Sequence, residues 1–261
     1  MMKNNPFETH GVEHLSASSI NQFITSPCHW ILKVSGYKSS SNPAMWRGTV
    51  VDDAICNSFD LDLDAEKKIN RSIANAEMSF DDLYGYHQKN AEYDFADVYK
   101  ERTKIVDLVS LGVDFYNNLE WKPTECQRKI EIEFEDIPIP IIGYIDLTYE
   151  DCIRDIKTTA RLLSETPSSI CRQLSLYSLA EDKPALVDFL HVTTKQQQVV
   201  TREITDVEKH VSVLKKAAFA MMNVLSYSDD IYTVASLFYP DYDFWMWSDE
   251  DKVAAQQLWS I

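Results

Sequence analysis

Two acidic residues and a lysine lie close together near the middle of this 261-residue chain. Asp146 ends the run Gly-Tyr-Ile-Asp, and Asp155 and Lys157 follow in the run Arg-Asp-Ile-Lys. Alternate residues of a β-strand share a face, so we expect Asp155 and Lys157 to point the same way. Carboxylates are the ligands that Mg²⁺ and similar hard cations prefer, and a lysine beside a metal-bound water can orient that water. The spacing predicts metal-assisted attack on phosphorus.

The residues around this group predict two neighbouring strands. An isoleucine-rich stretch precedes Asp146, and the polar run 149–152 that follows is typical of a turn. The second strand is therefore expected to fold back beside the first, so that Asp146 faces Asp155 and Lys157.

A helix over about 168–180 should follow these strands. Gln173 and Tyr177 are four positions apart on it and are therefore neighbours on one face. Further on, 185–192 and 198–204 predict a hairpin-like pair of strands that extends the sheet, and 205–226 predicts a helix.

With two segments near the N-terminus, these motifs form an ordered set that runs from about residue 15 to 180. The segments are Leu15–Trp30, Trp46–Ile55, Gly143–Asp146, Asp155–Lys157 and Gln173–Tyr177. The set resembles the PD-(D/E)xK nuclease superfamily, specifically the branch that contains RecB-type nuclease domains, CRISPR adaptation nucleases and phage recombination exonucleases.

The resemblance implies an α/β fold with a central mixed β-sheet flanked by helices, a restriction-endonuclease-like core. It also implies a metal-dependent nuclease that hydrolyses phosphodiester bonds of DNA and leaves a 5′-phosphate. The residues implied at the site are Asp52, Asp146, Asp155 and the carbonyl oxygen of Ile156 as ligands of one or two Mg²⁺ or Mn²⁺ ions, with Lys157, Gln173 and Tyr177 as catalytic residues. Lys157 would position the attacking water, and Gln173 would hold a water or a phosphate oxygen.

Some of these positions have a second interpretation. Asp52 lies on a helix expected to begin around Gly48 and takes the place of the His or Glu of the family, so it is either a third carboxylate ligand or a surface acid. Asp53 points about 100° away from it. Gln173 and Tyr177 could equally form a plain buried pair.

The strand predicted over 128–135 carries a further open question. Ile130, Ile132 and Phe134 alternate with glutamates, so the apolar residues should face the core. Glu131 or Glu133 would then line the cleft or simply face water at the sheet edge.

No linker or repeat divides the chain, which predicts a single domain over residues 1–261 with a helical insertion at about 60–122. In this insertion we expect helices over 61–73 and 98–109 and a loop over 84–90. The six aromatic residues between Phe238 and Trp247 would form a core lid, a base-stacking surface or a contact with another subunit, followed by a helix near 249–259.

The apolar stretches and the cysteines of the sequence predict where the protein is located and which cofactor it lacks. No apolar stretch approaches the ~20 residues that span a bilayer, and no signal peptide is evident, so a cytoplasmic protein without membrane association is expected. Five cysteines lack C-x-x-C spacing. None follows Cys171, whereas some relatives hold an iron–sulfur cluster with three C-terminal cysteines, so we expect no such cluster.

The formal charge of −16 is unusual for a protein that binds DNA. Basic residues near the motifs could still face phosphates: Lys33, Lys38, Arg47, Arg154, Arg161 and Arg172. The preferred hypothesis is an exonuclease of recombination, repair or phage DNA processing that acts on linear DNA with free ends, with a possible homo-oligomer or recombination partner protein. The alternative is a catalytically silent DNA-end-binding or assembly subunit with the same fold.

Overall fold

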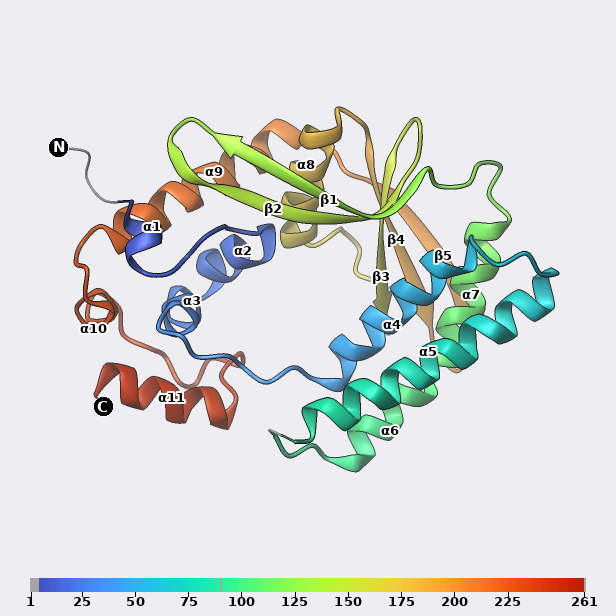
Figure 1. The fold of residues 1–261 in the computed structure, drawn as a ribbon, viewed down its shortest axis with the longest axis horizontal. Helices are drawn as coiled ribbons and strands as arrows, with labels where there is room; N and C mark the ends of the chain where they lie inside the picture. The colour runs from blue at the N-terminus through green and yellow to red at the C-terminus, as the bar shows by residue number, and fades with distance from the viewer. Residues whose placement is uncertain (1–4, 90, 261) are drawn as a thin grey trace.

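A five-stranded β-sheet crosses the centre of the protein in the computed structural model, which describes residues 5–89 and 91–260 (Figure 1). The strands are β1 (Glu125–Phe134), β2 (Ile137–Thr148), β3 (Ile153–Thr159), β4 (Ala185–Val192) and β5 (Gln197–Glu203), and their order in the sheet is the order in the chain. Only β3 and β4 run parallel; every other neighbouring pair is antiparallel. The sheet is therefore mixed.

Helix α8 (Ser168–Glu181) is the crossover between the two parallel strands. A parallel pair needs such a long connection, and an α-helix is its usual form. This crossover places α8 against the sheet, next to the strand that carries Asp155 and Lys157. The predicted hairpin of β4 and β5 is also present.

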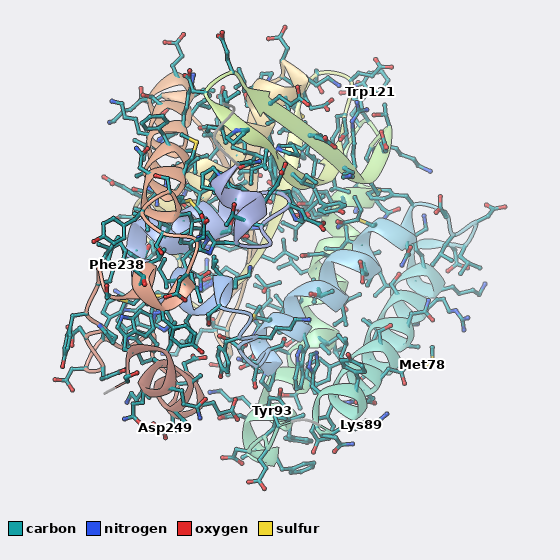
Figure 2. The ribbon with its side chains drawn as sticks, turned by 60° about the vertical axis from the view of Figure 1, so that its left-hand side comes forward. Met78, Lys89, Tyr93, Trp121, Phe238 and Asp249 are labelled. Atoms are coloured by element: carbon teal, nitrogen blue, oxygen red, sulfur yellow. The ribbon has the colours of Figure 1, made fainter. Side chains whose placement is uncertain are left out.

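Two hydrophobic clusters lie on opposite faces of β4, because its alternate residues belong to different clusters. One cluster joins the sheet to the helices of both chain ends: α1 (Pro6–Thr9), α2 (Ala17–Thr25), α3 (Pro27–Val34), α8, α9 (Val207–Leu225), α10 (Ile231–Ala235) and α11 (Asp249–Trp259). The other joins it to α4 (Pro43–Ser58), α5 (Ala65–His87), α6 (Phe95–Thr103) and α7 (Ile105–Asn117). Figures 1 and 2 show these two helical groups on either side of the sheet, with Phe238 and Asp249 in the first and Met78 and Tyr93 in the second.

Local signals explain where the N-terminal helices begin. Ser16 caps α2 through a reciprocal capping box with Ser19, and Pro27 is the first residue of α3. The start predicted for α4 around Gly48 was wrong. The helix begins at Pro43, because Asn42 accepts the Met45 N–H and proline favours the first helical position.

The region 60–122 is helical, but three of its predicted details were wrong. The helix expected over 61–73 begins only at Ala65, because the Asp64 side chain caps it by accepting the Lys67 N–H. The expected loop over 84–90 begins late, since α5 continues to His87. Trp46 stacks on the His87 ring with centroids 5.0 Å apart, and this tertiary contact outweighs the low helix propensity of Gly85. The helix predicted over 98–109 is divided at Lys104, whose N–H bonds the Glu101 carbonyl in a tighter turn. None of the described helices is long and apolar enough to span a membrane.

The aromatic C-terminal segment belongs mostly to the first cluster. Trp247 is buried and stacks on His29 of α3, with ring centroids 3.6 Å apart. The Trp259 indole donates hydrogen bonds to the carbonyls of Ala235 and Phe238. Trp245, by contrast, is 81% exposed. Most of this segment packs as a lid over the core.

Candidate active site

The site lies where β2 and β3 separate. These two strands share only two register pairs, Leu147 with Arg154 and Thr148 with Ile153. At the next position, the Asp146 carboxylate accepts a hydrogen bond of 2.8 Å from the Ile156 N–H. The Asp146 carboxylate thus satisfies a backbone N–H of β3 that no longer has a partner on β2, because the pairing of the two strands has ended. This bond holds the Asp146 side chain against the middle of β3.

Asp155 and Lys157 project from the same face of β3, as the strand period predicts. The Lys157 ammonium is 2.5 Å from the Asp155 carboxylate. Asp155 is buried, whereas the Lys157 side chain is 32% exposed. The lysine therefore extends from a buried anion toward solvent, where a substrate could meet it.

Asp52 approaches this pair from α4. One of its carboxylate oxygens is buried and has no hydrogen-bond partner among the described residues. Asp146, Lys157 and Asp155 all act on its charge at short range. Asp53, the next residue of α4, is exposed. The helix therefore directs one acid of this adjacent pair into the site and the other toward water.

The carboxylates of Asp52, Asp146 and Asp155 have only the Lys157 ammonium as a nearby positive charge in the described structure. The pKa shifts in the site reflect this excess of negative charge. Burial, followed by repulsion from Asp155, raises the pKa of Asp146 to about 7, although Lys157 opposes the rise. Burial and the Asp146 charge likewise raise the pKa of Asp52 well above its usual range. Burial disfavours the Lys157 ammonium, but the Asp155 and Asp146 carboxylates together raise its pKa. The site is short of positive charge.

A divalent cation would supply the positive charge that the site lacks. The buried, unpartnered Asp52 oxygen and the mutual repulsion of the acids are both features that an oxygen-binding cation would relieve. In the described part of the chain, however, no three His, Cys, Asp or Glu side chains converge closely enough to form a ready-made metal centre. Ile156, implied as a carbonyl ligand, lies between Asp155 and Lys157 with its side chain buried and its N–H engaged by Asp146.

Gln173 and Tyr177 lie beside the site on α8, and they contact each other. The Gln173 amide donates a hydrogen bond of 3.0 Å to the Tyr177 hydroxyl. The tyrosine ring packs on Gly143 of β2 so closely that a Cβ there would be 2.4 Å from a ring carbon. This close approach gives a physical reason for glycine three residues before Asp146. Gln173 itself remains partly exposed.

Sequence reasoning missed Gln127. The register pairs Cys126 with Leu147 and Arg128 with Ile145, which puts Gln127 opposite Asp146. Its side-chain amide donates to the Cys56 sulfur at 3.9 Å and lowers the pKa of the nearby Asp146 carboxyl group, against the effect of burial. Gln127 has φ of 50°, a left-handed conformation that is strained for a residue other than glycine. No sequence signal reveals it, because the alternating pattern that predicts this strand begins only at residue 128.

Several other predicted residues lie outside this group. Glu131 and Glu133 are exposed on the edge strand β1, and the Glu131 carboxylate is 3.7 Å from the Lys129 ammonium. Arg47 bonds Glu101 and donates to the Thr158 hydroxyl at 3.1 Å, so it ties α4 to α6 and β3.

Two other candidate cations near the motifs, Arg154 and Arg172, already bond side chains of the protein. Arg154 forms an ion pair with buried Asp188 at 2.9 Å. Arg172 donates to the Asn21 side chain at 2.5 Å. These two guanidinium groups therefore have structural partners in the fold.

Comparison with known proteins identifies the family. A family model for the PD-(D/E)XK nuclease superfamily matches residues 14–225. The chain therefore belongs to the PD-(D/E)XK nuclease superfamily, and the predicted α/β fold class is confirmed. Members of this superfamily are usually nucleases, and they generally use divalent metal ions such as Mg²⁺.

Other comparisons add little. A search of curated proteins finds no match. A solved structure described as "Crystal structure of SSO0001" is 15% identical, with a TM-score of 0.36, over 56% of this chain and 73% of its own. A likeness at this level does not bear on function.

Proposed function

We propose that this protein is a divalent-metal-dependent DNA nuclease, and specifically an exonuclease that acts on linear DNA in recombination, repair or phage DNA processing. The observation that carries the proposal is the pairing of Asp155 with Lys157 on β3, beside Asp146 and the unpartnered Asp52 oxygen. Membership of the superfamily supports the same reaction class.

The carboxylates of Asp146, Asp155 and Asp52 hold the metal in this proposal, with the carbonyl oxygen of Ile156. Bound there, Mg²⁺ or Mn²⁺ supplies Lewis acidity and a water of lowered pKa. Because the neighbouring acids keep Lys157 protonated, it acts as a hydrogen-bond donor and orients the attacking water.

The helix α8 completes the proposed mechanism. Gln173 donates to Tyr177 through its amide nitrogen, so its carbonyl oxygen remains able to accept a hydrogen bond from a water. Tyr177 is held by its packing on Gly143 and therefore fixes the orientation of Gln173. The pair thus positions water at the exposed end of the site.

The net charge of −16 affects how the proposed nuclease would bind DNA. Repulsion between the acidic surface and DNA phosphates opposes binding, and bound cations at the site lower this repulsion locally. We therefore propose that the metal is required to hold the scissile phosphate at the site and to cleave it. A cytoplasmic location and a homo-oligomer or a recombination partner protein complete the proposal.

The test is degradation of end-labelled linear DNA and closed circular DNA of the same sequence, with Mg²⁺, Mn²⁺ or EDTA. An exonuclease should degrade the linear DNA, require the metal and leave closed circles intact. Cutting of closed circles would refute the exonuclease assignment but keep the nuclease assignment. An Asp155→Asn variant serves as the control for a contaminating nuclease.

The second candidate is a catalytically silent DNA-end-binding or assembly subunit. It is favoured by one observation: among residues 5–89 and 91–260, the acids do not converge into a ready-made metal centre. Isothermal titration with Mn²⁺ separates the two candidates. The nuclease should bind Mn²⁺ with an affinity that Asp155→Asn weakens, whereas the silent subunit should show no binding that depends on this residue.

A further inference from the structure

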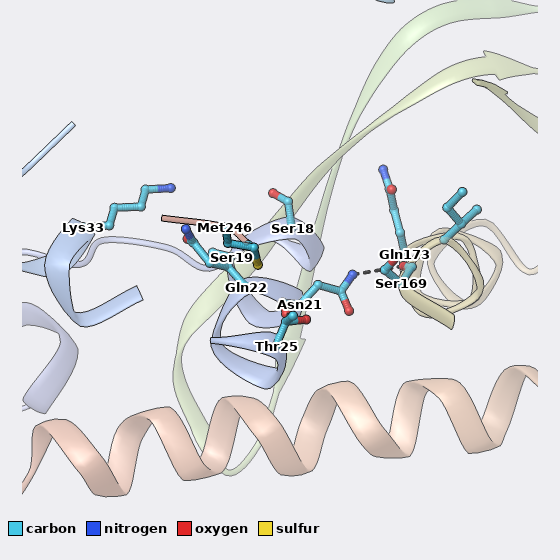
Figure 3. Close-up of a pocket in the computed structure, with 10 residues that line it drawn as sticks. Ser18, Ser19, Asn21, Gln22, Thr25, Lys33, Ser169, Gln173 and Met246 are labelled. Atoms are coloured by element: carbon cyan, nitrogen blue, oxygen red, sulfur yellow. Dashed lines mark hydrogen bonds between the residues drawn. The ribbon is translucent and has the colours of Figure 1, made fainter. Parts of the chain in front are cut away.

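Two adjoining cavities lie along α2 beside the candidate active site. Their volumes are about 480 and 550 Å³. Ser19 and Lys33 line both cavities, which therefore adjoin, and we call the two together the α2 groove. Figure 3 shows the first cavity, with Lys33 of α3 on one side of α2 and Gln173 of α8 on the other.

The wall of the first cavity combines polar and apolar groups and carries no acid among its described residues. Hydroxyl and carboxamide groups of Ser18, Asn21 and Gln22 line it, and Lys33 is the only charged residue among the described lining residues. The whole chain has 41 acidic and 25 basic residues, so this wall is a local exception to an acidic composition. The Asn21 amide already donates to the Ser169 carbonyl, and the Ser18 hydroxyl bonds the Ser16 hydroxyl. Gln22 and Lys33 therefore remain as donors for a phosphodiester, which accepts hydrogen bonds and carries a single negative charge.

Lys33 is available to such a ligand. It lies in the last turn of α3, and its side chain is exposed. Its ammonium makes no ion pair with any residue in the described ranges, unlike Lys157 or Lys104. Because it borders both cavities, one phosphate on Lys33 would have space on either side along the groove.

The first cavity borders the candidate active site at Gln173. This residue lines the first cavity and also bonds Tyr177, which lies near Asp155. The second cavity continues the groove away from the site, past His10 and His14, and Glu13 is the one acid among its described lining residues. A chain-like ligand lying in the groove would therefore have one end at Gln173, beside the candidate active site.

We propose that the α2 groove binds an unpaired DNA strand, with a backbone phosphate on Lys33 and a nucleotide in each cavity. The inference rests on the proposed nuclease function and adds the form of its substrate. Each volume is in the range of small-molecule sites, large enough for one nucleotide. In a duplex the bases are paired and stacked inside the helix, so only an unpaired strand can place them in separate cavities.

The experiment measures binding without catalysis, by fluorescence anisotropy in EDTA. Labelled oligo(dT) and a duplex of the same length are titrated with the full-length protein at several salt concentrations. The parent is compared with Lys33→Ala, Lys33→Arg and Gln22→Trp. The matched control is Lys67→Ala, which removes the same charge from an exposed ion pair with Asp64 on the far helical group. Thermal melting verifies that each variant is folded.

The parent should bind the single strand more tightly than the duplex. Lys33→Ala should weaken this binding and reduce the slope of log affinity against log salt by about 0.7, the value for one phosphate contact on a single strand. Lys33→Arg should restore the slope, Gln22→Trp should weaken binding by filling the cavity without a change of charge, and Lys67→Ala should match the parent.

The inference is refuted if the parent binds no single strand, if the duplex binds equally well, or if Lys33→Ala keeps the parental slope. These outcomes are independent of the nuclease assignment, which depends on metal-dependent cleavage. A protein that binds through Lys33 but never cleaves would support the groove and refute the nuclease.

Discussion

Replacing Asp146 by asparagine should stabilise the metal-free protein even as it removes cleavage. The oxygen of an asparagine side chain at this position can still accept the hydrogen bond that the Ile156 N–H donates to the native carboxylate. The substitution therefore keeps the size of the side chain and its anchor on β3. It removes the charge that burial and Asp155 disfavour.

The magnitude follows from the pKa of Asp146, which rises from 3.8 to about 7 on folding. A carboxyl group with a raised pKa binds its proton more tightly in the folded state, so stability falls as pH rises from about 4 to about 7 and stays low above that. The full shift corresponds to about 4 kcal/mol at pH 8. Because Asp146 keeps some contact with water, solvent screens part of this penalty, and we expect a gain of roughly 2 kcal/mol for Asp146→Asn.

The assay is urea unfolding in EDTA at pH 8 and at pH 4.5. Asp146→Asn should be more stable than the parent at pH 8, and the difference should shrink at pH 4.5, where the parental carboxyl group is protonated in the folded protein. Asp82→Asn, at an exposed position of α5, is the control for the loss of one charge. Equal stabilities of the parent and Asp146→Asn at pH 8 would refute the argument that this carboxylate carries an electrostatic penalty.

Substitutions at three further positions, Lys157, Asp52 and Gly143, test individual parts of the site. Lys157→Ala should reduce the cleavage rate by ~10²–10⁴-fold in a protein that still folds, with a lower melting temperature because buried Asp155 loses its ion pair. A rate within a few-fold of the parent would remove this lysine from the mechanism. Asp52→Ala should raise the metal concentration needed for cleavage, while Asp52→Glu and Asp52→His keep part of the activity. A metal titration measures this, and the ligand assignment fails if the exposed Asp53→Ala is the more damaging change. Gly143→Ala should displace the Tyr177 ring, because the added Cβ would be 2.4 Å from it. Cleavage should fall, and parental activity would show that the ring position is unimportant.

Short-range periodicity alone predicts much of the fold and part of the site. The two-residue repeat of a strand puts Asp155 and Lys157 on one face, and the helical repeat makes Gln173 and Tyr177 neighbours. The start of α2 is equally local, because Ser16 caps it through a reciprocal bond with Ser19. These features depend on residues within a few positions of each other, so the backbone geometry of one element determines them.

Contacts between side chains of different elements follow from the tertiary structure. Asp52 enters the site only because α4 lies against β2 and β3, and Gln127 reaches Asp146 through the pairing of β1 with β2. The continuation of α5 to His87 likewise depends on stacking with distant Trp46. Such contacts join residues tens of positions apart, and no local propensity encodes them.

The α2 groove is another feature for which the sequence supplies the residues and the tertiary structure determines their role. In the sequence, Lys33 is one of several cations near the motifs, and nothing distinguishes it from Arg47 or Arg154. Folding buries those two guanidinium groups in ion pairs with Glu101 and Asp188, and leaves the Lys33 ammonium exposed between two cavities. The kinds of charge and their spacing along the chain can thus be read from the residues alone. Which charges neutralise one another and which remain exposed cannot, because that depends on the packing of α3, α4 and α6 and on the pairing of β3 with β4.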